Sequence, residues 1–435
     1  MLTRSASRWL YIAPSIFMLW FLSNFDKLSI SIFVTNHDFL SALHILNNPA
    51  AVGLILSIFV WPYGICNFFW GFMVDRYGPR RIAMVSILGW TLAMLVGGLA
   101  YSYGAIVASR LILALAESAL WPVSLKLTST WFPRPERARA QTTYFYGQVL
   151  GFLFGALVVT ALLLSVGWRG AYFILAGLAL VVALPMFLLL VRDAPSQHYA
   201  TSPAEREYIG EADAALLVGK EVFRDWSATA RGLSDWRFWL LTGTMLVSSV
   251  ASFGLGGWLP SYLKTARHFP PTVMAFWVSA AWAVAAAVAL LTSWLGDRSH
   301  RFSLLGIVGL VIATVVLWVT PTTQDPNVAA PLVALGLATA LVPTYLTPGL
   351  LQEFYGARLQ GRLGGLMMGI SNLLSGFAPL VIGLLVASGK GSFSGAFTFL
   401  VAIIVAGMIC YAILLPVEVR RNRLAAQAQE AQTAG

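Results

Sequence analysis

Residues 303–320 read SLLGIVGLVIATVVLWVT, a run of eighteen positions without a charged side chain. A helix needs about 20 mostly apolar residues to cross the hydrocarbon core of a bilayer. Segments of similar length and character recur along the 435-residue chain, so we predict twelve membrane-spanning helices. They cover approximately residues 10–35, 50–74, 81–101, 104–127, 140–165, 170–191, 237–262, 272–295, 301–320, 331–352, 362–388 and 394–417.

The composition of the chain excludes a soluble protein. Hydrophobic residues make up 58% of the chain and charged residues 11%, whereas soluble domains have about 45–50% and about 25%. So few charges could not cover an aqueous surface of this size, and intrinsic disorder is excluded because there is too much apolar surface to leave unburied. The predicted fold class is an all-α membrane protein.

The twelve segments divide into two sets of six, separated by a polar stretch. We predict an N-terminal six-helix bundle over residues 1–191, a cytoplasmic linker over 192–235, and a C-terminal six-helix bundle with its tail over 236–435. Acidic residues follow Ser202-Pro203, which predicts a short helix inside the linker. As a whole, the linker is interpreted as a solvated tether.

Basic residues fall mainly on one side of the predicted helices. Of the 28 Lys and Arg residues, 21 lie in the termini or in loops on the side of the termini, 4 lie on the opposite side, and 3 lie within spans. The positive-inside rule therefore places both termini in the cytoplasm of a multi-pass plasma membrane protein, the inner membrane in a bacterium. Because topology explains the net charge of +10, no nucleic-acid partner is expected.

The two halves share a short repeat. Asp75-Arg76 ends the second predicted span, and Asp297-Arg298 ends the eighth, which is the matching position 222 residues later. Such duplication is typical of transporters built from structural repeats.

The loop after the second span resembles the signature loop of the major facilitator superfamily, in the motif Gly71-x-x-x-Asp75-Arg76-x-Gly78-x-Arg80-Arg81. Gly71 is expected to let helices approach closely. Asp75 is expected to cap a helix or pair with an arginine, in a latch that opens and closes as the halves rock, and Asp297-Arg298 would serve the same gating role. The alternative is that these basic residues serve topology only.

Further motifs, mostly in the first half, resemble those of the anion:cation symporter family, which includes bacterial sugar-acid and other organic-anion carriers. They are Asn24-Phe25-Asp26-Lys27, Arg110 with Glu117 and Pro122, Thr130-Trp131-Phe132-Pro133-x-x-Glu136-Arg137, Gly167-Trp168-Arg169, Arg192-Asp193-x-Pro195 and Glu205-Arg206-x-Tyr208-Ile209.

This resemblance implies a proton-coupled symporter that imports a small organic anion by alternating access. It assigns proton coupling to the acids Asp26 and Glu117, and contact with the anion to the base at Lys27. Two positions depart from the family pattern, since Lys27 stands in place of the usual arginine and Asn24 in place of the tyrosine of hexonate carriers. Both departures count against a hexonate as the substrate.

Four ionisable residues lie well inside predicted spans, namely Asp26, Lys27, Arg110 and Glu117. Each ion at the bilayer centre costs about 2.5–3.5 kcal/mol unless it is paired or faces water. Arg110 and Glu117 are seven residues apart and so share one helix face. Because the set is neutral, a carboxylate cargo would need a proton, and we hypothesise that Glu117 takes it up while Asp26 stays ionised beside Arg110. The alternative is an ion cluster that only locks spans one and four together.

Three neutral polar residues at mid-span are candidate substrate contacts. Tyr63 and Gln148 match positions that the resembled family uses for substrate hydroxyls, and Asn372 lies in the eleventh span. Each could instead form an interhelical hydrogen bond. Trp277 and Trp282 in the eighth span, and the prolines of the tenth, are left open between lining the site and packing.

Several function classes lack their motifs in this sequence. There is no phosphate-binding Gly-x-x-x-x-Gly-Lys-Ser/Thr loop, so protons and not ATP are the expected energy source. No catalytic Ser/His/Asp set and no carboxylate–histidine metal cluster falls within the spans, so we predict neither an enzyme nor a cofactor. The expected partners are a small organic anion and the bilayer, with a monomer as the working unit. The competing interpretations are an organophosphate exchanger and a transporter-like sensor without net flux.

Overall fold

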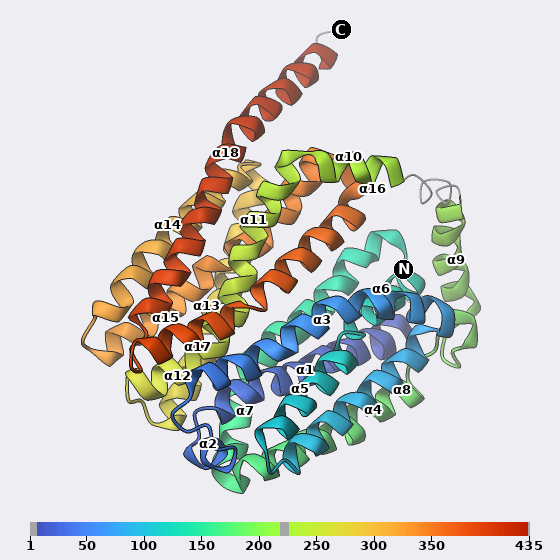
Figure 1. Ribbon diagram of the computed structural model, residues 1–435. Coiled ribbons are helices and arrows are strands. Elements are labelled where there is room, and N and C mark those ends of the chain that lie inside the picture. Colours follow the sequence, from blue (N-terminus) through green and yellow to red (C-terminus); the bar gives the residue numbers. More distant parts are fainter. Residues whose placement is uncertain (1–6, 218–225, 434–435) are drawn as a thin grey trace. The chain divides into compact units, whose positions relative to one another are not determined.

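The computed structural model describes residues 7–217 and 226–433 (Figure 1). Within these residues all regular secondary structure is helical, which confirms the all-α prediction. Eleven helical segments of the described chain are long and apolar enough to cross a membrane. Each of the twelve predicted spans overlaps one of these segments over most of its length, and the segment Pro135–Leu189 covers both the fifth and the sixth. Of the basic residues used to predict topology, Arg4, Lys220 and Arg224 lie outside the described residues.

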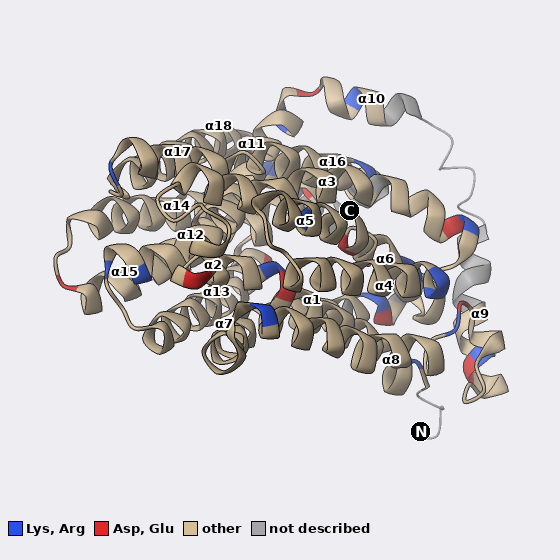
Figure 2. Cartoon of the chain, turned by 60° about the horizontal axis from the view of Figure 1, so that its bottom comes forward, with Lys and Arg blue, Asp and Glu red and all other residues tan. Residues whose placement is uncertain are grey.

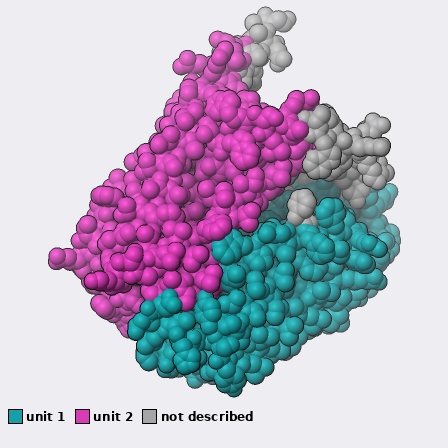
Figure 3. Space-filling view, in the orientation of Figure 1, with its two compact units in different colours: residues 1–48, 58–224, 271–279 teal, residues 49–57, 225–270, 280–435 magenta. Residues whose placement is uncertain are grey.

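The chain forms two compact units (Figure 3). Unit 1 comprises Met1–Asn48, Ile58–Arg224 and Pro271–Ser279, and unit 2 comprises Pro49–Ser57, Asp225–Pro270 and Ala280–Gly435. Most of the first half of the chain thus belongs to unit 1 and most of the second half to unit 2, while residues 49–57 belong to unit 2 and residues 271–279 to unit 1.

The helices in the first half of the chain are, in order, η1 Arg8–Ile12, α1 Ala13–Phe33, α2 His37–Ala42, α3 Pro49–Tyr77, α4 Pro79–Gly98, α5 Tyr103–Glu117, α6 Leu120–Trp131, α7 Arg134–Leu178, η2 Ala179–Ala183, α8 Leu184–Leu189, η3 Pro195–Gln197 and α9 Pro203–Leu217. Those in the second half are α10 Trp226–Ser234, α11 Trp236–Val250, η5 Ala251–Leu255, α12 Gly256–Ser261, η6 Tyr262–Ala266, α13 Pro271–Ser299, α14 Phe302–Val319, η7 Thr320–Thr322, α15 Pro326–Ala340, α16 Val342–Ser375, α17 Ala378–Ser388 and α18 Ser394–Thr433.

Glycine lets α1 and α7 pack backbone against backbone in unit 1. A Cβ atom at Gly147 would lie 2.5 Å from the carbonyl oxygen of Phe17, and one at Gly151 would lie 2.7 Å from that of Phe21. Close approach through small residues is how helices associate in a bilayer, where apolar side chains gain little by leaving lipid. This contact fixes α7 beside the part of α1 that carries the charged residues.

One glycine explains why α7 spans two predicted helices. Gly167 has φ 71° and ψ 174°, a left-handed conformation inside an otherwise continuous helical assignment. Glycine adopts such a positive φ without the steric penalty of a side chain. The chain therefore changes direction at Gly167 between the fifth and sixth spans, without a separate loop.

The first part of the linker is docked on unit 1, so the expectation of a solvated tether is wrong there. The predicted helix after Ser202-Pro203 is present as α9, and Glu205 in its first turn is fully buried. The Glu205 carboxylate accepts hydrogen bonds from the Ser7 hydroxyl (2.8 Å) and from Arg8 Nη1 (2.7 Å). A buried carboxylate is stabilised only where such partners replace water.

Arg8 also binds a second carboxylate, that of Glu136 at the start of α7. Its Nε and Nη2 atoms each donate to a carboxylate oxygen of Glu136, both at 2.9 Å, while its Nη1 donates to Glu205. A guanidinium presents donors in a planar fork that suits such two-sided pairing. The start of α1, the start of α7 and the linker helix are thereby held together by one buried arginine.

Candidate functional site

The four intramembrane charges come together within unit 1, where α1 meets α5. Lys27 Nζ lies 3.4 Å from Glu117 Oε2. Arg110 Nη1 donates to the backbone carbonyl oxygen of Asp26, also at 3.4 Å. Figure 2 shows that charged residues otherwise lie mainly near helix ends and in loops. Two adjacent residues of α1 are thus in contact with two residues that lie two turns apart on α5.

These four side chains are buried to different degrees. Glu117, Asp26 and Arg110 are 0%, 1% and 2% exposed, whereas the Lys27 side chain is 12% exposed. The two carboxylate oxygens of Glu117 and the Oδ1 atom of Asp26 have no hydrogen-bond partner among the described residues. An ionised carboxylate that is buried without hydrogen bonds is costly, so its charge must be balanced by a nearby cation.

The ion pairing differs from the one we expected. The hypothesis placed Arg110 beside the Asp26 carboxylate and left Glu117 to take the proton, but the ion pair in this structure joins Glu117 to Lys27. Arg110 contacts the Asp26 backbone, and its guanidinium lies over the ring of Phe59 at 4.8 Å. The seven-residue spacing predicted one shared face correctly, but it could not say which neighbour each long side chain would reach.

Aromatic rings enclose the Lys27 ammonium, and the sequence interpretation missed one of them. Lys27 Nζ lies 5.1 Å from the ring of Trp20 and 5.4 Å from the ring of Tyr63. The indole nitrogen of Trp20 donates to Ser124 Oγ at 2.8 Å, which holds the ring in place. Cations bind favourably over aromatic faces within about 6 Å. The sequence could have predicted this contact, because Trp20 precedes Lys27 by seven residues, about two helical turns, and so lies on the same helix face.

The neutral candidates fall in both units. Asn24 is buried in α1 and donates through Nδ2 to the backbone carbonyl of Trp20 at 2.6 Å, while its Oδ1 has no partner among the described residues. Gln148 follows Gly147, so it lies on α7 at the level of Trp20. Asn372 belongs to unit 2, where it accepts a hydrogen bond from Ser249 Oγ at 3.2 Å. This contact matches the interhelical alternative for Asn372.

In the signature loop, Asp75 pairs with a lysine. Asp75 Oδ1 lies 2.8 Å from Lys126 Nζ, and both side chains are exposed, by 71% and 42%. The close helix approach expected at Gly71 is wrong for the described residues, because none of their atoms lies within 4 Å of a Cβ atom placed at that position. Arg76 lies over the ring of Tyr77, and Arg81 is exposed.

The second part of the loop connects α3 and α4 to the linker. Gly78 has φ 88°, and a Cβ atom there would lie 2.6 Å from Asp193 Oδ1. That oxygen accepts a hydrogen bond from the Arg80 backbone N–H at 2.8 Å, at the first turn of α4, where an acid also interacts favourably with the helix dipole. Arg80 in turn donates through Nη2 to the carbonyl of Leu188 at 2.7 Å, at the end of α8. Gly78 is required by backbone geometry, and Arg80 joins two helix ends.

The repeat of this loop in unit 2 makes different contacts. Asp297 and Arg298 are both exposed at the end of α13. The guanidinium of Arg298 lies over the ring of Trp294 at 5.7 Å. The local sequence is repeated, but no ion pair of Asp297 like that between Asp75 and Lys126 is found among the described residues.

A two-unit, all-helical membrane protein with charges buried in its spans has the architecture of a secondary transporter. Residues 16–379 match the sequence profile of the Major Facilitator Superfamily, and the chain belongs to this superfamily. It is a multi-pass membrane transporter and not an enzyme.

Similar proteins agree with this assignment. The chain is 28% identical over 397 residues to the D-galactonate transporter of Escherichia coli O6:H1, an alignment that covers 86% of this chain and 88% of that protein. It is 24% identical over 381 residues to the "Probable sulfoacetate transporter SauU" of Cupriavidus necator, with 85% of each covered. These relatives confirm the resemblance to bacterial sugar-acid and organic-anion carriers.

The fold is also that of solved transporters. A bacterial homologue of the human lysosomal transporter Spinster, in an inward-facing and unoccupied conformation, aligns with a TM-score of 0.75 at 17% identity. The alignment covers 95% of this chain and 97% of that one, so nearly the whole fold is shared.

Proposed function

We propose that this transporter imports a small organic anion, a carboxylate or sugar acid, together with protons by alternating access. The relatives named above carry anions of this kind. Lys27, whose side chain is 12% exposed within a span of unit 1, offers a positive charge to receive a carboxylate. In this proposal both termini are cytoplasmic, as the distribution of basic residues indicates, and the monomer is the working unit.

The single observation that carries the proposal is the Lys27–Glu117 pair. Glu117 is fully buried, its oxygens accept no hydrogen bond among the described residues, and its nearest cation is the ammonium that would have to bind the substrate. Substrate and Glu117 therefore compete for the same positive charge. Protonation of Glu117 removes one competitor and leaves Lys27 free for the carboxylate of the cargo.

The charge balance supports coupling. Asp26, Lys27, Arg110 and Glu117 sum to zero when all four are ionised. A monoanion alone would leave a net negative charge in a low-dielectric site, whereas a monoanion with one proton keeps the site neutral. Release of the anion on the other side lets Lys27 pair with Glu117 again as the proton leaves. In this scheme a loaded site and an empty site are both neutral, and both can reorient.

Aromatic and polar neighbours would define the substrate. Tyr63 and Trp20 flank the Lys27 ammonium, and Gln148 lies at the same level of α7. We assign Tyr63 and Gln148 to hydroxyl groups of the cargo, and Asn24 Oδ1 to a donor of the cargo. Lysine lacks the planar fork of arginine, so Lys27 would select a substrate for its negative charge and would impose little on the orientation of its carboxylate group. The lysine at this position therefore favours a small carboxylate as the substrate over a hexonate that must be held in one orientation.

The two exposed loop motifs are assigned to gating. The Asp75–Lys126 pair is an ion pair between α3 and α6 that can break at modest cost, because exposed pairs contribute only about 0–1 kcal/mol. Arg76, Gly78, Arg80, Arg81 and the Asp297-Arg298 repeat belong to the same proposed gating machinery.

The decisive experiment uses Glu117→Gln in proteoliposomes. The amide keeps the size of the side chain but takes up no proton. We expect uptake driven by an imposed pH gradient to fall at least 100-fold, while exchange of labelled for unlabelled substrate across the membrane continues. Glu207→Gln, an exposed glutamate of α9, is the matched control and should leave both activities unchanged.

Two results would reject the proposal. Accumulation of substrate by Glu117→Gln to the wild-type level would show that this acid does not couple transport to protons. Wild-type uptake that is unchanged by uncouplers and depends on phosphate inside the vesicles would instead indicate an organophosphate exchanger.

A further inference from the structure

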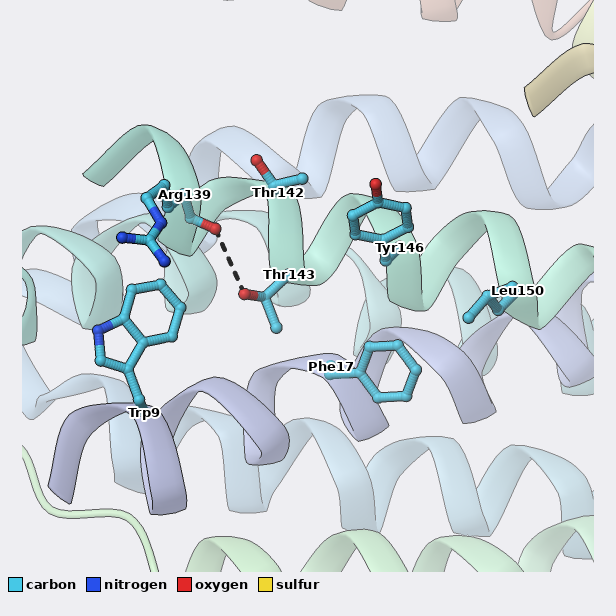
Figure 4. A pocket seen from close by; sticks show the side chains of 7 residues that line it. All are labelled: Trp9, Phe17, Arg139, Thr142, Thr143, Tyr146 and Leu150. Atoms are coloured by element: carbon cyan, nitrogen blue, oxygen red, sulfur yellow. Dashed lines mark hydrogen bonds between the residues drawn. The ribbon is translucent and has the colours of Figure 1, made fainter. Parts of the chain in front are cut away.

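A groove with a volume of about 500 Å³ lies along the side of unit 1, between the start of α1 and the start of α7 (Figure 4). Trp9 and Phe17 form one wall. Arg139, Thr143, Tyr146 and Leu150 form the other, on α7. The α7 residues follow one another at spacings of four, three and four, so they form one continuous stripe on that helix.

The groove is polar at one end and apolar at the other. Arg139 lies at the end beside Trp9, and Leu150 lies at the opposite end, beyond Phe17 and Tyr146 (Figure 4). Eleven residues of helix separate Arg139 from Leu150, which corresponds to about 16 Å. That length is close to half the thickness of the hydrocarbon core, about 15 Å. A ligand that fills the groove is therefore an amphiphile whose length matches one leaflet.

The polar end is rigidly built. The indole N–H of Trp9 donates to Glu136 Oε2 at 2.9 Å, and its ring meets the ring of Phe132 edge-on at 4.9 Å. Glu136 is itself held by the paired hydrogen bonds from Arg8. The Trp9 ring thus stands in a fixed position, and the guanidinium of Arg139 lies over it at 5.5 Å.

Within the part of the chain that the structure describes, the positive charge of Arg139 has no acidic partner, unlike that of its neighbour Arg8. Arg8 pairs with Glu136 and Glu205. Arg139 is exposed and pairs with no carboxylate among the described residues. A cation held over an indole at the edge of a membrane span is in a position to bind an anionic group from solvent or lipid.

The groove is separate from the proposed transport site. Gln148 lies about 170° around α7 from the mean direction of the groove residues, at 100° per residue. Gly147 and Gly151, which contact α1, lie between the two directions. A ligand in the groove would therefore occupy a different face of α7 from the candidate substrate contacts.

We propose that this groove binds an anionic phospholipid. The phosphate or other negative headgroup pairs with Arg139 above the Trp9 ring, and one acyl chain lies along Phe17, Tyr146 and Leu150. Basic pockets between helices on the positively charged side of a membrane protein bind anionic headgroups. A soluble anion would satisfy Arg139 but leave the apolar part of the groove uncovered, which is why a lipid fits better.

The test uses the full-length protein in nanodiscs and two lipids that differ only in headgroup. Phosphatidylglycerol and phosphatidylcholine, each with a photoreactive group in the acyl chain, are crosslinked separately, and the labelled peptides are mapped by mass spectrometry. We expect phosphatidylglycerol to label peptides that contain Phe17 or residues 146–150 several times more strongly than phosphatidylcholine does.

Variants identify the headgroup contact. Arg139→Gln should reduce labelling by phosphatidylglycerol about fivefold, the effect of one basic residue near an anionic surface. Arg139→Lys keeps the charge and should retain most of the labelling, which distinguishes headgroup binding from a packing role. Arg420→Gln is the control and should leave the labelling unchanged, because this exposed arginine belongs to unit 2 and does not line the groove.

Three outcomes would overturn the proposal. Equal labelling of the groove by both lipids would show that the headgroup charge is not recognised. Crosslinks confined to other peptides would show that the groove holds no lipid. Competition by soluble glycerol phosphate at millimolar concentration would show that the site takes a free anion instead.

Discussion

Unit 1 and unit 2 bury different kinds of polar group within their spans. In unit 1 the buried groups include the ionisable side chains of Asp26, Arg110 and Glu117, with Lys27 partly accessible. In unit 2 a buried acid, Glu418, lies near the end of its span and accepts hydrogen bonds from the backbone N–H groups of Phe302 and Ser303. Nearer the middle of the spans, the side-chain hydrogen bonds described in unit 2 join neutral groups. They connect Thr244 to Thr347 at 3.0 Å, Thr347 to Tyr411 at 2.7 Å and Ser249 to Asn372 at 3.2 Å.

The difference indicates a division of labour. The hydroxyls of unit 2 satisfy one another and carry no charge, so they fix helices to each other without responding to protons. By contrast, both carboxylate oxygens of Glu117 and the Oδ1 atom of Asp26 accept no hydrogen bond among the described residues, so the cost of burying these charges depends on the cations beside them. Under the proposed mechanism, coupling to protons belongs to unit 1, and the hydrogen bonds of unit 2 hold its helices together.

The largest effect is expected from removal of the cation in unit 1. Lys27→Met leaves Glu117 without its ion-pair partner, and breaking a buried pair from one side costs about 3–5 kcal/mol. At pH 8 we expect this loss of stability together with a loss of uptake of at least 100-fold. At pH 5 the loss of stability should shrink, because a protonated Glu117 leaves no uncompensated charge.

Thermal unfolding and proteoliposome uptake check this prediction together. The double variant Lys27→Met/Glu117→Gln should regain stability at pH 8 but not uptake, since both partners are then neutral. A Lys27→Met protein as stable as the wild type at pH 8 would show that the pair contributes little, and would contradict the contrast between the units.

The next effect concerns the buried charges that hold the linker. Glu205→Gln removes the acid that accepts from Ser7 and Arg8, so part of their hydrogen bonding is lost. Loss of a charged hydrogen-bond partner in a buried site costs about 1–3 kcal/mol. We expect α9 to become cleavable by protease under conditions in which the wild type resists.

Glu207 supplies the control for this experiment, because it lies in the same helix but is exposed. Glu207→Gln should leave cleavage unchanged. Equal protection of α9 in the Glu205→Gln and wild-type proteins would mean that the linker is held by packing and not by charge.

A smaller effect is expected in unit 2. Thr347→Val removes a hydroxyl that bonds both Thr244 and Tyr411, while the shape of the side chain is nearly kept. Hydrogen bonds between membrane helices average about 0.6 kcal/mol and reach about 1.7 kcal/mol. The melting temperature should fall slightly, and the ratio of proton-driven uptake to exchange should stay at the wild-type value. A variant that folds but loses its response to the pH gradient would place part of the coupling in unit 2.

The smallest effect is a pH dependence at the docked linker. His198 is 1% exposed, and its burial lowers the pKa of the imidazole below the usual value of about 6.5. A lowered pKa means that the unfolded state binds the proton more readily. The stability from His198 is therefore fully present above about pH 6.5 and is lost as the pH falls through the lower pKa of the folded protein, by at most about 1.4 kcal/mol per pH unit.

Protease sensitivity of the linker measured between pH 7 and pH 5 tests this dependence. His198→Gln should flatten it, while His37→Gln, at a histidine whose side chain is 75% exposed, should not. A linker equally resistant at both values in the wild type would exclude His198 as the titrating group.

Much of the fold and part of the site could be predicted from the sequence. The twelve spans follow from runs of apolar residues that are long enough to cross a bilayer, and this is a local property of the chain. The shared face of Arg110 and Glu117 follows from helical periodicity, which is also local. The gathering of these residues near Asp26 and Lys27 was expected because isolated charges are too costly in lipid.

Other features depended on contacts between distant segments. The role of Gly78 became clear only beside Asp193, 115 positions later, and the reason expected for Gly71 was wrong. The linker looked like a solvated tether because it is rich in charge. Its burial depends on Arg8, nearly 200 residues earlier in the chain.

By itself, then, the sequence determined that this is a membrane protein of two six-helix halves with a neutral set of charges in the first. Run length, periodicity and the cost of an ion in hydrocarbon are sufficient for that conclusion. Only the tertiary structure decided that Lys27, and not Arg110, pairs with Glu117, and that the first part of the linker packs on unit 1. Long side chains can reach several neighbours, and the packing of the surrounding helices selects among them.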